Sequence, residues 1–196
     1  MDLSDGPLRA LRFDCKAGSL RMTTKEASVP KVCITRATVD DSEGILRCLR
    51  AAFEPYRTQY TPRGYEDTVM TSETVRKRIE TMTVLVARNE LGLIIGTVGA
   101  AVRGAEGHIR GMAVVPSLQG CHVANHLLEA IEAELTVAGC SFVTLDTTAP
   151  LARAIRFYER NGYVRSGTVS NFFGMPLFEY MKSLQSSKGP GSDDTR

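Results

Sequence analysis

The sequence has few cysteines, no long apolar run and no block of a single charge. Its five cysteines are widely spaced and form no C-x-x-C pair, which argues against a disulfide framework and favours reduced thiols. No stretch approaches the roughly 18 consecutive apolar residues that a membrane-spanning helix needs. The 24 basic and 22 acidic residues are scattered, so no nucleic-acid tail or membrane patch is indicated. We expect a soluble, cytoplasmic protein without nucleic-acid or membrane partners.

Several motifs that would assign a chemistry are also missing. Neither the Walker pattern G-x-x-x-x-G-K-[ST] nor the three-glycine dinucleotide fingerprint is present, which argues against a kinase and a Rossmann dehydrogenase. His122 and His126 have the spacing of a zinc helix, with His108 as a conceivable third ligand. However, Val123 occupies the place of the catalytic Glu in H-E-x-x-H, and a cation at a helix N-terminus opposes the helix dipole. No metal is therefore predicted.

The composition is that of a globular chain. With 196 residues, 43% hydrophobic and 23% charged, the chain is long enough for one sizeable core, so one domain is the default. Residues 1–30 show no sustained periodicity, and residues 185–196 are rich in Gly, Ser and Asp. We expect a flexible N-terminal arm over 1–30, a folded domain over 31–184 and a disordered tail over 185–196.

Strand-like and helix-like segments follow one another in the order β-α-α-β-β-β-α-β-α-β-β. Short apolar or alternating runs indicate strands, and apolar residues at intervals of three and four indicate helices. The predicted strands are 31–37, 83–89, 91–104, 107–115, 141–147, 163–169 and 176–184, and the predicted helices are 39–56, 72–82, 123–139 and 151–162. Consecutive strands occur beside β-α-β segments, which predicts a mixed sheet flanked by helices, of the α/β or α+β class.

One turn between a strand and a helix carries the clearest chemical indication. The apolar stripe of the helix starts at Val123, so the segment Gln119 to Ala124 supplies the loop and the first helical turn. The first N–H groups of a helix have no partner within it and lie at the positive end of its dipole, and Gly120 lets another group approach the backbone. The turn therefore suits a phosphate or pyrophosphate. The alternative is a tight turn at Gly120 with a solvated Gln119.

Two motifs give the sequence a family resemblance. The stretch "HIRGMAVVPSLQGCHVANHLLEAIEAEL" resembles the acetyl-CoA-binding motif of the GNAT superfamily of N-acyltransferases, whose pattern is [RQ]-x-x-G-x-[GA]. Gln119 and Ala124 match this pattern, and His122 stands in place of its second glycine. The stretch "LARAIRFYERNGY" resembles the late helix of the same family, with Leu151 in place of an Asn. Its matching residues are Ala154, Tyr158, Glu159, Gly162 and Tyr163.

The resemblance spans roughly residues 31–184 and implies a central mixed, mostly antiparallel sheet. It also implies an N-acetyltransferase, with acetyl-CoA as co-substrate and a primary amine that attacks directly in a ternary complex. In the family, amides of the turn bind the pyrophosphate and the preceding strand contacts the pantetheine arm. The implied cofactor-binding residues are Met112, Ala113, Val114, Gln119, Gly120, Cys121, His122, Val123, Ala124, Ala154 and Tyr158. A non-catalytic acyl-CoA-binding or regulatory module is the alternative, because His122 and Leu151 depart from the pattern.

Acyl transfer from a thioester to an amine needs a proton donor and a proton acceptor. An alkyl amine with a pKa of about 10.4 is protonated at neutral pH, and the departing thiolate requires a proton. Tyr158 is where the family often carries the phenol that protonates the thiolate, although burial on its helix face is the alternative. The family often carries a Glu near the start of the strand, where alignment places His108, an imidazole suited to accept a proton. Glu106 lies two residues earlier on the same face and is the second candidate base. A solvated strand end is the alternative for either one.

Two variable segments, 54–71 and 170–177, are expected to form the acceptor cleft. They bring aromatic side chains to the place where the family opens this cleft, and a lid packed for stability is the alternative. The candidate substrate-binding residues are Tyr56, Tyr60, Phe172 and Phe173. The acceptor is expected to be a small-molecule or protein amine, and neither its identity nor a homodimeric assembly is determined by these residues.

Overall fold

The computed structural model describes residues 11–13 and 32–184. The expected arm (1–30) and tail (185–196) lie outside the described residues with one exception. Leu11–Phe13 forms strand β1, which pairs antiparallel with β2 (Val32–Arg36). This part of the predicted arm is therefore a sheet strand, and three residues are too few to show the alternation by which a strand is predicted.

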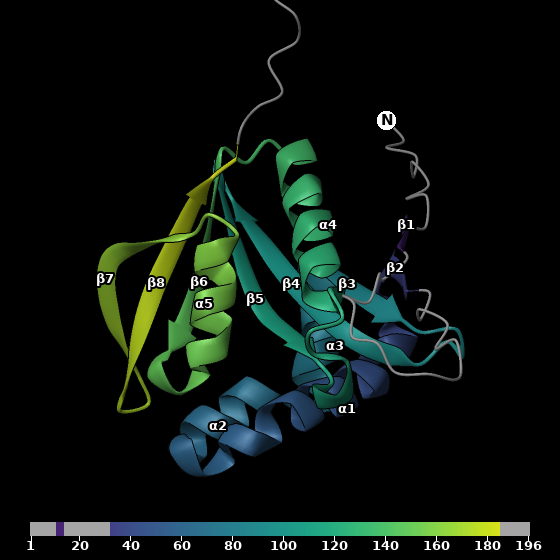
Figure 1. The fold of residues 1–196 in the computed structure, drawn as a ribbon, viewed down its shortest axis with the longest axis horizontal. Coiled ribbons are helices and arrows are strands. Elements are labelled where there is room, and N and C mark those ends of the chain that lie inside the picture. The colour runs from purple at the N-terminus through teal and green to yellow at the C-terminus, as the bar shows by residue number, and fades with distance from the viewer. Residues whose placement is uncertain (1–10, 14–31, 185–196) are drawn as a thin grey trace, which may run out of the picture.

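Eight strands of the described chain form one sheet in the order β1-β2-β3-β4-β5-β6-β8-β7 (Figure 1). Neighbouring strands are antiparallel except β5 and β6, which are parallel. The remaining strands are β3 (Thr83–Arg88), β4 (Ile94–Arg103), β5 (Glu106–Val114), β6 (Phe142–Thr148), β7 (Val164–Phe172) and β8 (Met175–Ser183). The predicted mixed, mostly antiparallel sheet is confirmed.

Helices cover both faces of the sheet (Figure 1). They are α1 (Ser42–Phe53), α2 (Pro62–Val69), α3 (Ser72–Thr81), α4 (Val123–Val137) and α5 (Ala152–Arg160). Each face of the sheet has its own apolar core. Strand β3 contributes to both, because Leu85 and Ala87 pack on the α4 side while Val84 and Val86 pack on the α1 side. No helix in the described ranges is both long and apolar enough to cross a membrane.

Helix α2 lies in a segment for which the sequence pattern predicts no helix. Pro62 and Gly64 are residues that usually interrupt helices. Here Pro62 occupies the first turn, where its missing N–H is not needed, and the Thr61 hydroxyl accepts a hydrogen bond from the Gly64 N–H at 3.3 Å. The helix start therefore depends on a cap and a position-specific proline, which periodicity does not detect.

Strands β5 and β6 separate halfway along their length. They are paired from Glu106 and Phe142 to Ile109 and Leu145, and no pairing follows in the described residues. On its other side β5 contains a bulge, because three steps along it match two steps along β4. Gly111 lies in this bulge with φ +60°, a conformation that favours glycine. The bulge bends β5 away from β6, and a gap opens between their carboxyl ends.

Candidate active site

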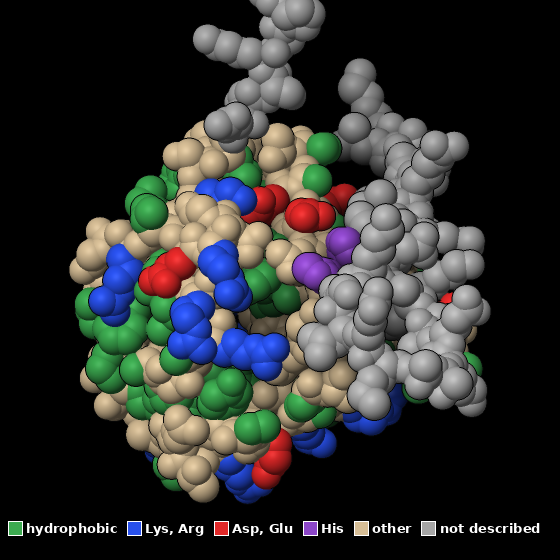
Figure 2. Space-filling model, in the orientation of Figure 1, with side chains coloured by type: hydrophobic (Ala, Val, Ile, Leu, Met, Phe, Trp, Pro, Cys, Tyr) green, Lys and Arg blue, Asp and Glu red, His purple; other side chains and the backbone are tan. Residues whose placement is uncertain are grey.

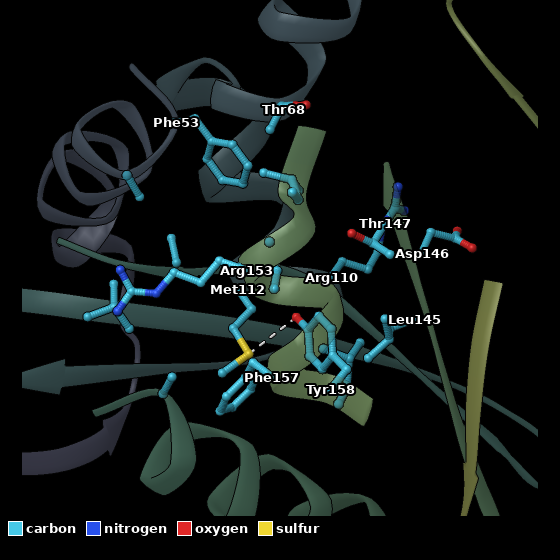
Figure 3. Close-up of a pocket in the computed structure, with 18 of the residues that line it drawn as sticks. Phe53, Thr68, Arg110, Met112, Leu145, Asp146, Thr147, Arg153, Phe157 and Tyr158 are labelled. Atoms are coloured by element: carbon cyan, nitrogen blue, oxygen red, sulfur yellow. Dashed lines mark hydrogen bonds between the residues drawn. The ribbon is translucent and has the colours of Figure 1, made fainter. Parts of the chain in front are cut away.

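A cavity of about 660 Å³ lies where β5 and β6 separate. Residues from α5 and from the turn before α4 line it on one face of the sheet, and residues from α1, α2 and α3 line it on the other (Figure 3). The cavity therefore passes between the strands from one face to the other. Such a shape can hold two ligands that meet in the gap.

The turn before α4 contains two residues with positive φ. Gly120 has φ +92°, and His122, which immediately precedes the helix, has φ +59°. The left-handed region costs a non-glycine residue about 1–2 kcal/mol. This requirement explains why a glycine suits position 122 in the motif, and the histidine here adopts the same backbone conformation.

Four backbone N–H groups of this turn are open to a ligand. Within the described chain they have no hydrogen-bond acceptor, and they belong to Gly120, His122, Val123 and Ala124. The remaining two N–H groups of the segment 119–124 already have acceptors. Gln119 N–H donates to Pro116 O and Cys121 N–H donates to Leu118 O, each at 3.3 Å. The expectation that all six amides face a pyrophosphate is thus corrected, because the turn's own hydrogen bonds occupy two of them.

The Gln119 side chain joins the end of β5 to α5. Its Nε2 donates to Val114 O at 3.1 Å, and its Oε1 accepts from Arg153 Nη1 at 2.9 Å. The alternative of a solvated Gln119 is therefore wrong. Arg153 also stands over the turn, because a Cβ added at Gly120 would lie 3.8 Å from its Nη2.

Basic side chains gather over α5, beside a hollow in the molecular surface (Figure 2). Helix α5 contributes Arg153, Arg156 and Arg160, all exposed, and the first and last of these line the cavity. Together with the N-terminus of α4 they place positive potential on this face of the gap. The arrangement suits a ligand with several phosphate charges.

Tyr158 lies at the centre of the cavity wall (Figure 3). Its side chain is buried, and its hydroxyl donates a hydrogen bond to Met112 Sδ at 3.4 Å. Burial raises the pKa of the Tyr158 phenol, so the hydroxyl stays protonated at neutral pH. Ala154, one turn earlier on α5, lines the same wall. A buried, protonated phenol facing the gap meets the chemical requirement for a proton donor.

His108 is buried rather than solvated and belongs to a hydrogen-bonded chain. The Thr144 hydroxyl donates to the Glu106 carboxylate, and His108 Nδ1 lies 2.8 Å from Thr144 Oγ1. Because the hydroxyl proton points to Glu106, the imidazole donates through Nδ1, which leaves the lone pair on Nε2. That nitrogen lies 3.6 Å from Asp146 Oδ2. Glu106 itself does not line the cavity and reaches it only through Thr144 and His108.

The environment of His108 holds it in the form that accepts protons. Burial lowers the pKa of His108, and the nearby Asp146 opposes this shift. Burial raises the pKa of Asp146, and His108 opposes that shift in turn. A neutral imidazole beside a carboxylate can take up a proton and have the resulting charge stabilised.

Aromatic side chains line the opposite end of the cavity. Tyr56, Tyr60 and Phe172 lie in its wall. Tyr60 is buried, and its hydroxyl lies 2.7 Å from Thr148 Oγ1. Phe173 is different, because it lies outside the cavity wall with 45% of its surface exposed. It lies in the turn after β7 with φ +49°, and its ring packs edge-on against that of Phe172, with 5.0 Å between the ring centroids.

The structure also shows where the remaining predicted residues lie. Met112 lines the cavity together with Ala113 and Val114. The Val123 side chain is packed in the core, so only its backbone is available to a ligand. The described ranges contain no group of three or more His, Cys, Asp or Glu side chains arranged to hold a metal ion. The zinc alternative therefore has no ligand set in this part of the chain.

The cavity wall contains polar residues that the sequence patterns did not predict, and they include Arg78, Arg110, Asp146 and Thr147. They come from α3, β5 and β6 and belong to no motif. One signal was available, because Arg110 follows His108 by two residues on the same strand and so shares its face. Asp146 and Thr147 reach the cavity through the register of the sheet, and Arg78 reaches it through the packing of α3.

The chain matches a family model and a curated protein. The model is described as the acetyltransferase (GNAT) family, and the match covers residues 45–163. The IAA acetyltransferase of Azospirillum brasilense is 32% identical over 100 residues, which are 50% of this chain and 65% of the relative. The chain thus aligns with slightly less than two thirds of that relative's length.

Solved structures share the fold. The PaiA N-acetyltransferase from Thermoplasma acidophilum, in complex with coenzyme A, has a TM-score of 0.69 and 16% identity, covering 78% of this chain and 99% of its own. YncA from Salmonella typhimurium, with acetyl-CoA, has a TM-score of 0.62 and 17% identity, covering 82% and 98%. The family match extends over more than half of the sequence and over most of the sheet that forms the cavity. The chain belongs to the GNAT acetyltransferase family.

Proposed function

We propose that the protein is an N-acetyltransferase that moves the acetyl group of acetyl-CoA to a primary amine by direct attack in a ternary complex. One observation carries the proposal: the open amides at the N-terminus of α4 border the same cavity as a buried phenol and a neutral histidine. Membership of the family supports the reaction class, and solved relatives contain coenzyme A or acetyl-CoA.

The donor occupies the face formed by α4 and α5. Its diphosphate accepts hydrogen bonds from the four open N–H groups and lies at the positive end of the α4 dipole, with Arg153 beside Gly120. The pantetheine arm then follows Met112, Ala113 and Val114 into the gap between β5 and β6. This path directs the thioester toward Tyr158.

The acceptor enters from the α1 face and loses a proton near His108. His108 Nε2 takes the proton of the ammonium, and Asp146 stabilises the imidazolium that forms. The hydrogen-bonded chain through Thr144 lets the Nδ1 proton pass on to Glu106. Both predicted bases thus have a role, with His108 in contact with the substrate and Glu106 behind it.

The neutral amine nitrogen then forms a bond to the acetyl carbonyl carbon. The nitrogen becomes positively charged on forming this bond and gives up its second proton to solvent. As the tetrahedral intermediate collapses, the bond between carbon and sulfur breaks and the electron pair leaves with the sulfur. The Tyr158 hydroxyl gives its proton to this thiolate, and solvent restores the phenol. A phenol is protonated at neutral pH, and burial raises the pKa of Tyr158 further, so its proton is present when the thiolate departs.

Thiol release from acetyl-CoA across an amine panel tests this function. Tyr158→Phe should lower kcat by about 100-fold or more while the acetyl-CoA KM changes little, because general acid catalysis contributes roughly 10²–10⁴-fold. Tyr163→Phe is the matched control, since it also removes a buried hydroxyl. That hydroxyl donates a hydrogen bond of 2.8 Å to Glu132, and Tyr163 does not line the cavity. The control substitution should lower stability by about 1 kcal/mol and leave kcat unchanged.

Tight binding of acetyl-CoA with no turnover on any amine would instead favour the non-catalytic module. A small-molecule or protein amine as acceptor, a homodimer and a cytoplasmic location remain predictions.

A further inference from the structure

Two arginines of the acceptor side form no ion pair within the described residues. Arg78 comes from α3 and Arg110 from β5, and both line the cavity. Within 32–184 neither forms an ion pair or a side-chain hydrogen bond. By contrast, Arg36 and Arg88 elsewhere in the fold pair with carboxylates at 2.9 and 2.6 Å. Asp67 acts electrostatically on Arg78, and Asp146 interacts in the same way with Arg110, but neither carboxylate forms an ion pair with them. The two guanidinium groups therefore keep hydrogen-bond donors available to a ligand.

The fold brings these two charges close together. Burial and the charge of Arg110 both lower the pKa of Arg78, while Asp67 opposes them. Arg78 is seated against the bulge of β5, because a Cβ added at Gly111 would lie 3.2 Å from its Nη1. Arg78 is partly buried and Arg110 is exposed. Like charges this close repel each other, and an anion bound between them relieves that repulsion. A carboxylate is the group that a guanidinium binds with two parallel hydrogen bonds.

The same cavity also offers a place for a cation and a further polar contact. Asp146 lies on β6 beside His108 and lines the gap. Thr147, the next residue, points to the opposite face of β6, the face of Leu145 that packs toward α4 and α5. It is only 3% exposed, lines the cavity, and its hydroxyl has no hydrogen-bond partner within the described chain. A buried hydroxyl without a partner is unfavourable, so a ligand atom is expected there.

We propose that the acceptor is a small amine that also bears a carboxylate, which Arg78 and Arg110 bind while the amine lies at His108 and Asp146. This inference rests on the proposed function and narrows its substrate class. A protein N-terminus or lysine side chain carries no carboxylate next to its amine, so the charge pattern favours a free amino acid or a related amino carboxylate over a protein. Arg78 and Arg110 are then specificity-determining residues that act on the acceptor and leave the donor unaffected.

Titration calorimetry with the full chain saturated with coenzyme A tests the proposal. The probes are the protein amino acids, each paired with the amine that lacks only its carboxylate. At least one amino acid should bind more tightly than its paired amine, and Arg78→Gln and Arg110→Gln should each weaken that binding by about 10- to 100-fold. The paired amine should change by less than about threefold, since it has no carboxylate for either arginine.

Arg76→Gln is the matched control, because Arg76 is an exposed residue of the same helix that does not line the cavity. It should leave both affinities unchanged. Arg78→Lys should give an intermediate loss, because it keeps the charge and loses the planar fork. Equal binding of every amino acid and its paired amine, or a loss of coenzyme A affinity in the arginine variants, would overturn the inference.

A parallel assay of thiol release separates this inference from the proposed function. Equal turnover of amines with and without a carboxylate would support the acetyltransferase activity and would refute the carboxylate site. Arginine-dependent binding of amino acids without any turnover would support the carboxylate site and would refute the proposed acetyltransferase activity.

Discussion

Residue 122 combines a histidine side chain with a backbone conformation that favours glycine. The imidazole is not needed for the open amides of the turn, whereas φ +59° is. His122→Gly and His122→Ala remove the same imidazole and differ only in the Cβ. We expect the alanine variant to be about 1 kcal/mol less stable than the glycine variant, because the Cβ is strained at positive φ. Urea unfolding of the two proteins measures this difference, and equal midpoints would contradict the assigned turn.

His108 predicts a specific pH dependence. Burial lowers its pKa below the ordinary 6.5, so the neutral base predominates at pH 7. For an alkyl amine, kcat/KM should rise with pH up to this pKa and then stay level up to the pKa of the amine, because the enzyme binds the ammonium and removes its proton. His108→Gln can use only the free amine, so its kcat/KM should rise steadily over the whole range. Identical profiles for the two proteins would show that His108 is not the base.

Motifs predicted the residues on the donor side of the site, and the aromatic content of two variable segments predicted Tyr56, Tyr60 and Phe172 on the acceptor side. The turn at Gly120 and the phenol at Tyr158 belong to two recognisable patterns and lie on the cavity wall as expected. Arg78 and Asp146 are separated by 67 intervening residues, and their approach depends on where α3 and β6 pack. No local pattern encodes such an approach.

At the scale of elements, the packing of α4 on β4 sets the position of the turn. A Cβ at Gly96 would lie 2.8 Å from Leu127 Cδ1, 3.2 Å from Val123 Cγ1 and 3.3 Å from Ala113 O. Gly96→Ala should therefore destabilise the fold by about 1–3 kcal/mol through overpacking. It should also weaken coenzyme A binding, because the start of α4 moves away from the sheet.

Gly99→Ala is the control on the same strand, since its Cβ would meet neighbours only at 3.5 Å and beyond. Thermal unfolding and calorimetry of both variants check the prediction. Unchanged coenzyme A affinity in a destabilised Gly96→Ala protein would contradict the prediction, because it would show that the packing of α4 does not set the position of the donor-binding turn.

Most elements were predictable from periodicity, and the two exceptions have physical causes. Strand β1 is too short to alternate, and α2 begins with a proline and contains a glycine. The bulge in β5 was also not predictable, because it depends on how β5 pairs with β4 around Gly111. Such features follow from the register between strands, which a single sequence does not specify.

At the scale of the whole molecule, the cavity opens to both faces of the sheet, so the two substrates can be bound together. Initial rates measured against acetyl-CoA at several fixed amine concentrations should give intersecting double-reciprocal lines. Parallel lines, together with an acetylated form of the protein, would indicate a covalent intermediate and contradict direct attack. Mass spectrometry of the protein after exposure to acetyl-CoA alone provides the second readout.

The proposed reaction depends above all on the donor binding through the open amides before α4. A crystal structure with coenzyme A measures this directly. We predict that diphosphate oxygens lie within hydrogen-bond distance of the N–H groups of Gly120, His122, Val123 and Ala124, with the thiol in the gap beside Tyr158. A diphosphate bound elsewhere, with these N–H groups facing solvent, would contradict the account.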